Sequence, residues 1–230
     1  MANTERAIRS RRDRPAKPAL TRQGIVDAAV RVMHADGLDK VTMRRLAAEL
    51  DTGAASLYVY VRDAAELRAA VLDELLAEVD LSPVAAEGDW RVRLSAVLRS
   101  YLGVLLTYPP LAHSALLTRP SGPRYLDLLE ALLSVLHQAG IDDRRAAWAV
   151  DLLLQTATAT GAEHVSGSDD PQDGRSSLDT LVEAATAGRY PRIIALGAEL
   201  FSGTGEDRVA WAFSVLLNGI LATPRTDPPT

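Results

Sequence analysis

The chain has 230 residues, of which 47% are hydrophobic and 24% charged, so it is typical of a globular protein that buries one large core or two modest ones. It contains no cysteine, which excludes disulfides, thiolate metal sites and cysteine nucleophiles. The net charge of −5 is unevenly distributed: residues 1–62 carry 12 Lys and Arg against seven Asp and Glu, whereas the rest carries 13 against 23. We therefore expect a polyanionic partner at the N-terminal end.

The N-terminal end begins with a basic segment. Residues 1–20 contain six basic side chains and few large apolar ones, and we expect them to form a flexible basic arm. No apolar stretch of signal-peptide type follows this arm, and no apolar run in the chain is long enough to cross a bilayer. We therefore expect no membrane partner and a cytoplasmic location.

Helical periodicity begins at Thr21, a good N-cap, and predicts a first helix that ends at about Asp36. A second helix is predicted from Thr42 to near Leu50, and a third from Ala54 to Tyr60. The turn between these two contains Gly53, so together they form a helix-turn-helix.

A long fourth helix is predicted from Asp63 to Asp80, and the first internal break follows at residues 81–88. The remaining sequence is rich in Ala and Leu and has no hairpin signals, which argues against a sheet and predicts an all-α fold. The further predicted helices cover residues 90–106, 110–117, 122–138, 142–165, 178–187, 190–201 and 205–222.

The third helix has an unusual outward face. With Leu57 turned inward, Ala55, Ser56 and Val59 point outward. Apolar side chains fit thymine methyl groups, while the hydroxyls of Ser56, Tyr58 and Tyr60 suit base edges and phosphates. This pattern favours a helix that lies in a DNA groove; the alternative is that the tyrosines are packed core aromatics and the arm is merely solvated.

Two arginines, Arg44 and Arg45, lie on the polar side of the second helix. Arginines in such positions usually face water, but the helix that precedes a recognition helix runs close to the DNA backbone. Arg44 is the first candidate for a phosphate contact.

The segment from Thr42 to Leu50, followed by Gly53 to Asp63, resembles the DNA-binding region of the TetR family of bacterial transcriptional repressors. The resemblance extends to Trp90, to the Leu-Thr-Arg-Pro sequence that ends at Pro120, and to residues 190–222, which are similar to the regulatory core of the tetracycline repressors. It implies a homodimer that reads a palindromic operator in double-stranded DNA through two helix-turn-helix heads, with an all-helical core that binds a small-molecule effector.

The resemblance also implies an organisation and a set of DNA contacts. Residues 1–20 would be the flexible arm, 21–68 the helix-turn-helix DNA-binding domain, 69–222 the ligand-binding and dimerisation domain, and 223–230 a disordered tail. The phosphate-binding lysine of many relatives is Ala64 here, so Arg62 or the arm would have to replace it. The implied DNA-binding residues are Arg44, Arg45, Ala54, Ala55, Ser56, Tyr58, Val59, Tyr60 and Arg62.

The positions that hold a drug–magnesium chelate in tetracycline repressors are Ala115, Asp80 and Val97 here, although an acidic residue near that metal corresponds to Glu163. Because a methyl group cannot replace an imidazole ligand, we expect neither tetracycline–magnesium binding nor any metal or cofactor. The effector is therefore unknown. Its candidate pocket residues are Tyr101, His113, Arg119, Tyr125, Trp148, Leu152, Gln155 and Thr156.

Two polar residues in that set, Gln155 and Thr156, lie within an apolar helix. If buried, they need a partner, which a ligand, a second subunit or water would supply. The aromatic candidates have the alternative of being core residues, and His113 that of being a surface residue.

The dimer implied by the resemblance is a four-helix bundle built from residues 142–165 and 205–222 of each subunit. Its glycines would allow close packing, although simple tolerance is the alternative. The expected interface residues are Gly161, Glu163, Trp211, Val215 and Gly219.

The competing function is an enzyme or a helical small-molecule-binding protein that does not bind DNA. The sequence contains no His-Glu-x-x-His motif, glycine-rich phosphate loop or Gly-x-Ser-x-Gly elbow, so we expect no enzyme. The basic N-terminal end weighs against a scaffold that never meets DNA.

Overall fold

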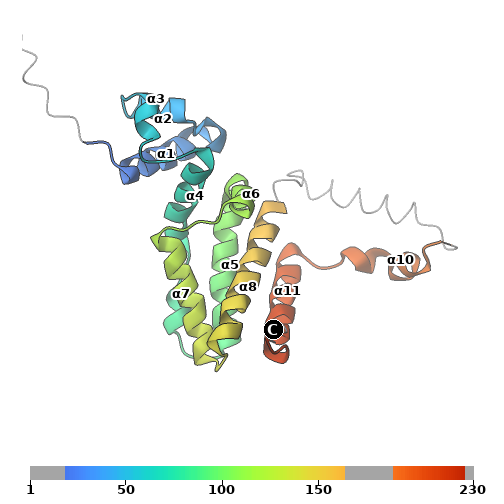
Figure 1. Cartoon of the computed structure of the whole chain (residues 1–230). Helices are drawn as coiled ribbons and strands as arrows, with labels where there is room; N and C mark the ends of the chain where they lie inside the picture. Colours follow the sequence, from blue (N-terminus) through green and yellow to red (C-terminus); the bar gives the residue numbers. More distant parts are fainter. Residues whose placement is uncertain (1–18, 164–188, 226–230) are drawn as a thin grey trace, which may run out of the picture. The chain divides into compact units, whose positions relative to one another are not determined.

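The computed structural model describes residues 19–163 and 189–225, and all regular elements in these ranges are α-helices or 3₁₀ turns (Figure 1). The all-α prediction is therefore confirmed for the described residues. Most of the predicted arm, the predicted helix at 178–187 and most of the predicted tail lie outside them. The chain divides into two compact units, residues 1–60 and 61–230.

In the first unit, α1 (Arg22–Asp36), α2 (Met43–Glu49) and α3 (Ala54–Leu57) surround a small core, with a 3₁₀ turn, η2 (Leu38–Lys40), between the first two. The hydroxyl of Thr21 accepts a hydrogen bond from the Gly24 amide at 3.0 Å, and that of Thr42 accepts one from the Arg45 amide at 3.2 Å. These caps satisfy amides that the first helical turn leaves unpaired. The fully buried side chains of this core are Ile25, Ala28, Ala29, Leu46 and Leu57.

The helix α3 is shorter than the predicted span from Ala54 to Tyr60. The amide of Tyr60 bonds to the Leu57 carbonyl, three residues back, at 3.0 Å. This closes a tight turn instead of continuing the α-helical ladder. Tyr58, Val59 and Tyr60 therefore follow the helix on an exposed bend.

The second unit begins with α4 (Ala64–Leu75), which is capped by the Asp63 carboxylate, and continues as the 3₁₀ turn η3 (Leu76–Glu78). The predicted helix to Asp80 is too long. The Asp80 amide donates to the Ser100 hydroxyl at 2.7 Å, and its carboxylate accepts from the Ser82 amide at 2.9 Å. Asp80 is thus held by α5 and by the turn η4 (Ser82–Ala85), away from the helical ladder.

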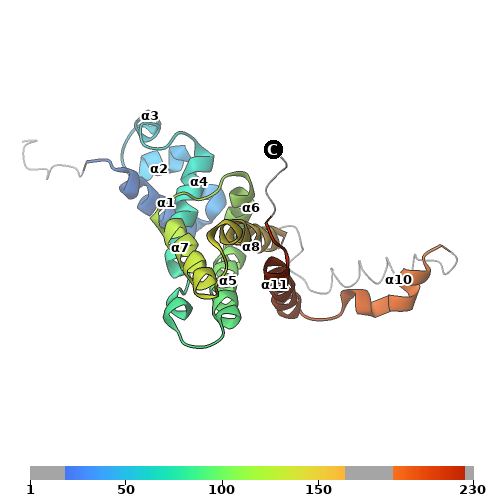
Figure 2. The ribbon, with the colours of Figure 1, turned by 60° about the horizontal axis from the view of Figure 1, so that its bottom comes forward.

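The bundle of the second unit consists of α5 (Trp90–Thr107), α6 (Pro109–Leu117), α7 (Pro123–Gln138), α8 (Asp143–Glu163) and α11 (Gly205–Ala222). The helix α8 packs against α5, α6 and α7, while α11 packs against α5 and α8 (Figures 1 and 2). The bundle core is almost entirely aliphatic, which is the main source of its stability. Its fully buried large side chains include Leu94, Leu98, Tyr101, Leu105, Leu111 and Leu128.

The predicted helix at 190–201 is two elements, α10 (Pro191–Leu196) and the 3₁₀ turn η5 (Gly197–Phe201). Gly197 separates them because its φ of 50° lies in the left-handed region, where a helix cannot continue. The side chains of Ile193, Ile194 and Leu196 are exposed on α10. No helix among the described residues has the length and apolar character needed to cross a bilayer.

Candidate functional site

The turn between α2 and α3 is a Schellman-type helix end. The Thr52 amide bonds to the Ala47 carbonyl at 2.8 Å, and the Asp51 amide bonds to the Ala48 carbonyl at 3.2 Å. The residue with positive φ is Asp51, at 49°, whereas Gly53, expected to allow the turn, is an extended N-cap with a φ of −82°. This compact turn fixes α3 close to α2.

The exposed part of α3 and the bend after it carry the side chains expected to read DNA. Leu57 is fully buried, while Ala55 and Ser56 are exposed. Val59 is 79% and Tyr58 52% exposed, and no hydrophobic partner within the first unit covers them. Of the other expected contacts, Tyr60 is also exposed and Ala54 is half-buried. Within this unit, Tyr58 and Tyr60 are therefore not packed core aromatics, which was the alternative interpretation.

The three expected arginines differ in how they are held. Arg45 forms ion pairs with Asp36 at 3.3 Å and Glu49 at 3.5 Å. The structure gives the exposed Arg44 side chain no ion pair among the described residues. Arg62, in the second unit, bonds to Glu66 at 3.0 Å, and this hydrogen bond raises the pKa of its guanidinium. Among these three arginines, Arg44 is thus the one that forms no ion pair with a carboxylate of the described residues.

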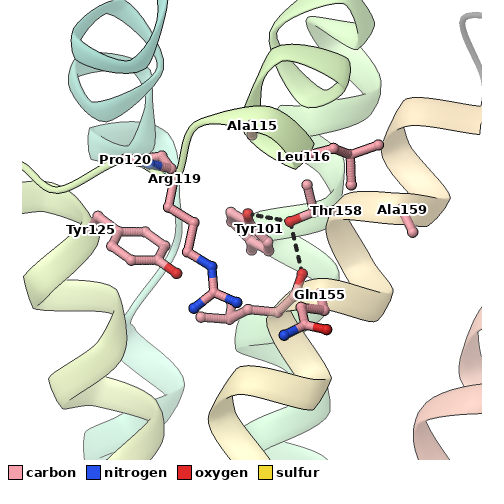
Figure 3. A pocket seen from close by; sticks show the side chains of 10 residues that line it. Tyr101, Ala115, Leu116, Arg119, Pro120, Tyr125, Gln155, Thr158 and Ala159 are labelled. Carbon is pink, nitrogen blue, oxygen red and sulfur yellow. Dashed lines mark hydrogen bonds between the residues drawn. The ribbon is translucent and has the colours of Figure 1, made fainter. Parts of the chain in front are cut away.

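A cavity of about 300 Å³ lies in the second unit between α5, α6, α7 and α8 (Figure 3). It brings together four of the expected pocket residues: Tyr101 from α5, Arg119 from the loop after α6, Tyr125 from α7 and Gln155 from α8. The other lining residues are Ala115, Leu116, Pro120, Leu154, Thr158 and Ala159.

The polar floor of this cavity is a short hydrogen-bond chain. The Thr158 hydroxyl donates to the Leu154 carbonyl at 2.7 Å, which leaves its oxygen to accept from the Tyr101 hydroxyl at 2.8 Å (Figure 3). Burial raises the pKa of Tyr101 to about 12 and also raises the pKa of Tyr125. Both phenols are therefore neutral hydrogen-bonding groups at physiological pH.

The other expected pocket residues lie elsewhere. His113 is exposed on α6, and Trp148 and Leu152 are exposed on the side of α8 that faces α11. Thr156 is half-buried outside the cavity, and its hydroxyl donates to the Leu152 carbonyl at 2.8 Å. The polar partner expected for Thr156 is thus supplied by its own helix, a possibility that sequence reasoning did not consider.

Two functional candidates were missed by sequence reasoning, Thr158 and Asp73, and both are buried polar residues. The Asp73 carboxylate, on α4, accepts a hydrogen bond from the Tyr125 amide at 2.9 Å at the start of α7. A signal existed: the N-cap of α7 is Gly122, which has no side chain to accept from the first amides. A carboxylate from a distant part of the chain had to supply that cap.

A second hollow, of about 560 Å³, lies on the surface between α8 and α11. Trp148, Leu152, Val215 and Gly219 line it, and Trp211 is 71% exposed on α11. Two of the five residues expected at a dimer interface, Val215 and Gly219, thus line this hollow, and a third, Trp211, is exposed one turn before Val215 on α11.

The glycine expected at the interface on α8 requires a correction. Gly161 is buried, and a Cβ there would lie 2.7 Å from the Cβ of Leu105 on α5 and 3.5 Å from that of Ala112 on α6. Its small size therefore serves close helix packing inside the subunit. Glu163, the last residue of α8, is exposed.

The helix-turn-helix of the first unit is a motif of DNA-binding transcriptional regulators, and here it is followed by an all-helical unit with a pocket between its helices. Residues 25–71 match the family model described as "Bacterial regulatory proteins, tetR family", and residues 82–223 match "Tetracyclin repressor-like, C-terminal domain". The chain belongs to the TetR family of bacterial transcriptional regulators.

Individual relatives agree with this assignment. The HTH-type transcriptional repressor DrrR1 of Streptomyces coeruleorubidus is 29% identical over 218 residues, which cover 91% of this chain and 80% of that repressor. The crystal structure of the putative transcription regulator SCO7704 of Streptomyces coelicolor is 50% identical, with a TM-score of 0.80 over 93% of this chain and 100% of that one. ActR of Streptomyces coelicolor in complex with actinorhodin is 31% identical, with a TM-score of 0.75 over 89% and 97% of the two chains.

Proposed function

We propose that this protein is a homodimeric repressor that binds a palindromic operator and leaves it when a small molecule occupies the cavity of the second unit. Residues 21–68 would serve as the DNA-binding domain and 69–222 as the ligand-binding and dimerisation domain. Two recognition helices would enter half-sites about one helical turn, roughly 34 Å, apart. A protein that acts on the bacterial chromosome works in the cytoplasm.

The observation that carries the DNA-binding part is the exposed surface of α3 and the bend after it. Ala55, Ser56 and Val59 present methyl and hydroxyl groups without intramolecular partners in the first unit. Such groups suit thymine methyls and base edges, and an arginine without a carboxylate partner, Arg44, suits a phosphate. Exposed apolar groups of this kind would be unfavourable in water unless a partner covers them.

The ligand-binding part is supported by the cavity and by the relative ActR, whose crystal structure contains actinorhodin. The cavity combines apolar walls with a few convergent polar groups, which is the usual composition of a small-molecule site. Ligand binding would shift the population toward a dimer whose recognition helices no longer match the operator spacing.

Asp73 offers a path from the cavity to α4. Its carboxylate holds the first turn of α7, where the Tyr125 side chain lines the cavity. Arg119 also lines the cavity and lies three residues before Gly122, the N-cap of α7. A ligand that moves either side chain would therefore act on Asp73, and α4 continues along the chain from the DNA-binding unit.

The dimer is supported by the apolar surface between α8 and α11. Trp148 and Trp211 are both more than half exposed in the single chain. Within the described ranges, a Cβ added to Gly219 would meet no atom within 4 Å, which leaves space for a partner helix. A second copy that pairs the same helices would bury both tryptophans in a four-helix bundle.

Mobility shifts with DNA from upstream of the protein's own gene test the proposal. We expect a discrete complex whose affinity falls steeply with salt, because binding releases counterions from phosphates. Affinity for a scrambled DNA of equal length should be at least about a thousandfold weaker. Equal affinity for both DNAs, or no complex at low salt, would contradict the proposed function.

A further inference from the structure

The lining of the cavity between α5, α6, α7 and α8 contains one positively charged side chain. Arg119 is the only charged side chain among the described residues that line it. Tyr101 and Tyr125 are neutral phenols, and Gln155 and Thr158 are neutral as well. Its guanidinium is paired with a partly exposed carboxylate outside the lining, that of Asp151, so a ligand that brings a negative charge can compete for it.

The carboxylate that pairs with Arg119 is loosely held. Asp151 lies one turn before Gln155 on α8 and forms an ion pair with Arg119 at 2.5 Å, with both side chains about half exposed. Exposed ion pairs contribute about 1 kcal/mol or less to stability. A ligand carboxylate can therefore replace Asp151 at the guanidinium with little loss, and the released Asp151 remains hydrated and bonded to Gln155.

The remaining lining is mainly apolar. Pro120, Leu116 and Leu154 provide apolar walls, and the Tyr125 ring lies beside the Arg119 side chain (Figure 3). The volume of about 300 Å³ is at the lower end of the range for small-molecule sites, so a small ligand fits better than a large one.

We propose that the effector is an aromatic carboxylate whose rings occupy this cavity and whose carboxylate takes the place of Asp151 at Arg119. The inference rests on the proposed ligand-controlled function. It adds the chemical class of the effector and the residue that selects it. It also provides a trigger, because an anion at Arg119 acts on the loop that leads into Gly122 and the Asp73 cap.

Titration calorimetry with the full-length protein tests this inference through two matched pairs of probes: 2-naphthoate with 2-naphthamide, and anthraquinone-2-carboxylate with its amide. Each pair shares a shape and differs in charge. We expect at least one carboxylate to bind up to about five times more tightly than its amide, because the pair that it forms with Arg119 replaces an exposed pair worth about 1 kcal/mol or less. The variant Asp151→Asn, which removes the competing carboxylate, should tighten carboxylate binding further.

The decisive variant is Arg119→Gln, which should remove the preference for the carboxylate and leave the affinity for the amide unchanged. Arg124→Gln is the control: this arginine is half exposed on α7, pairs with Asp127 at 3.9 Å and does not line the cavity. Arg124→Gln should keep the full preference. Thermal melts of both variants verify that they fold.

Three results would overturn the inference: no binding of either carboxylate at millimolar concentration, equal affinity for carboxylate and amide, or a preference that persists in Arg119→Gln. None of these depends on DNA. Operator binding measured without probes reports on the repressor function separately, so failure of one proposal is distinguishable from failure of the other.

Discussion

The carboxylate of Asp73, in the last turn of α4, accepts a hydrogen bond from the backbone amide of Tyr125, 2.9 Å away in the first turn of α7. The two residues are 52 positions apart in the chain. Asp73 is only 7% exposed, and the Tyr125 side chain lines the cavity. One buried carboxylate thus replaces the missing cap of α7 and ties the cavity to the helix that follows the DNA-binding unit.

Removal of this cap should destabilise the second unit. We expect Asp73→Ala to lower the free energy of unfolding by about 1–3 kcal/mol, because it leaves buried amides without an acceptor. Asp73→Asn keeps one acceptor oxygen and should cost less. Urea unfolding measures both, and Asp127→Asn on the exposed side of α7 should change stability by less than about 0.5 kcal/mol. Equal stability of Asp73→Ala and the wild type would show that the cap contributes nothing.

Substitutions at Gly122 and Asp73 should have coupled effects on the free energy of unfolding. A Cβ at Gly122 would overlap the Asp73 carboxylate, so Gly122→Ala must displace either the cap or the start of α7. We expect Gly122→Ala to destabilise the protein on its own and to cost clearly less in the Asp73→Ala background, where the carboxylate is absent. A double-mutant cycle by urea unfolding gives the coupling energy, which should be about 0.5–3 kcal/mol; strict additivity would contradict the contact.

Arg44 and Arg45 should contribute unequally to operator binding. Arg44 has no described ion-pair partner, whereas Arg45 is held by Asp36 and Glu49. We expect Arg44→Ala to weaken binding to all DNA sequences and to reduce the slope of log affinity against log salt by about 1, because one phosphate contact is lost. Arg45→Ala should have the smaller effect. Mobility shifts over a range of salt concentrations measure both, and a larger effect at Arg45 would reverse the assignment.

Substitution of Gly219 should weaken the dimer without destabilising the fold of the subunit. A Cβ at Gly219 would lie within 4 Å of no atom of the described residues, and the same is true of Gly103 on the exposed side of α5. Both Gly219→Leu and Gly103→Leu should therefore be tolerated by the subunit, since leucine favours a helix over glycine by about 0.8 kcal/mol. Only Gly219→Leu should weaken the dimer in sedimentation equilibrium. An unchanged dissociation constant of the dimer would show that the interface lies elsewhere.

Tyr101 should make stability depend on pH in the alkaline range. Its pKa is raised by burial to about 12 in the folded state, against an ordinary value of 10. The unfolded chain therefore loses the proton first, and the stabilisation that is fully present below pH 10 is lost as the pH rises toward 12. Two pKa units correspond to about 3 kcal/mol.

The variant Tyr101→Phe should reduce this alkaline loss of stability, and it should cost about 1 kcal/mol at neutral pH for the hydrogen bond to Thr158. Tyr58→Phe, on an exposed side chain, is the matched control and should leave the pH profile unchanged. Urea unfolding at pH 8, 10 and 11 measures the difference. A parallel shift of the whole profile in Tyr101→Phe would mean that this phenol is not the titrating group.

Several features of the fold follow from local sequence alone. Thr21 and Thr42 cap the helices that the periodicity predicts, because a cap and its amides lie within three residues of each other. The inward Leu57 and the outward Ala55 and Ser56 follow from the angle between successive helical residues. The family motif lies in this same short stretch, so the family and the helix-turn-helix could both be predicted.

The cavity and the interface could not be predicted in the same way. Tyr101 and Thr158 form one hydrogen bond across 57 residues, and sequence reasoning selected the neighbouring Thr156 in place of Thr158. Trp148 was expected in the cavity and lies on the side of α8 that faces α11, while Gly161 was expected at the interface and packs against Leu105. These three errors have one origin: the sequence did not indicate which side of α8 packs against which neighbouring helix.

The amino-acid sequence by itself therefore determined the helices, their caps and the DNA-reading motif, because these depend on interactions between residues a few positions apart. Only the tertiary structure decided that Asp73 caps α7, that Arg119 reaches the cavity and that Gly161 faces inward. These contacts depend on how helices distant in the chain pack together, and an apolar helix such as α8 offers more than one face that could be buried.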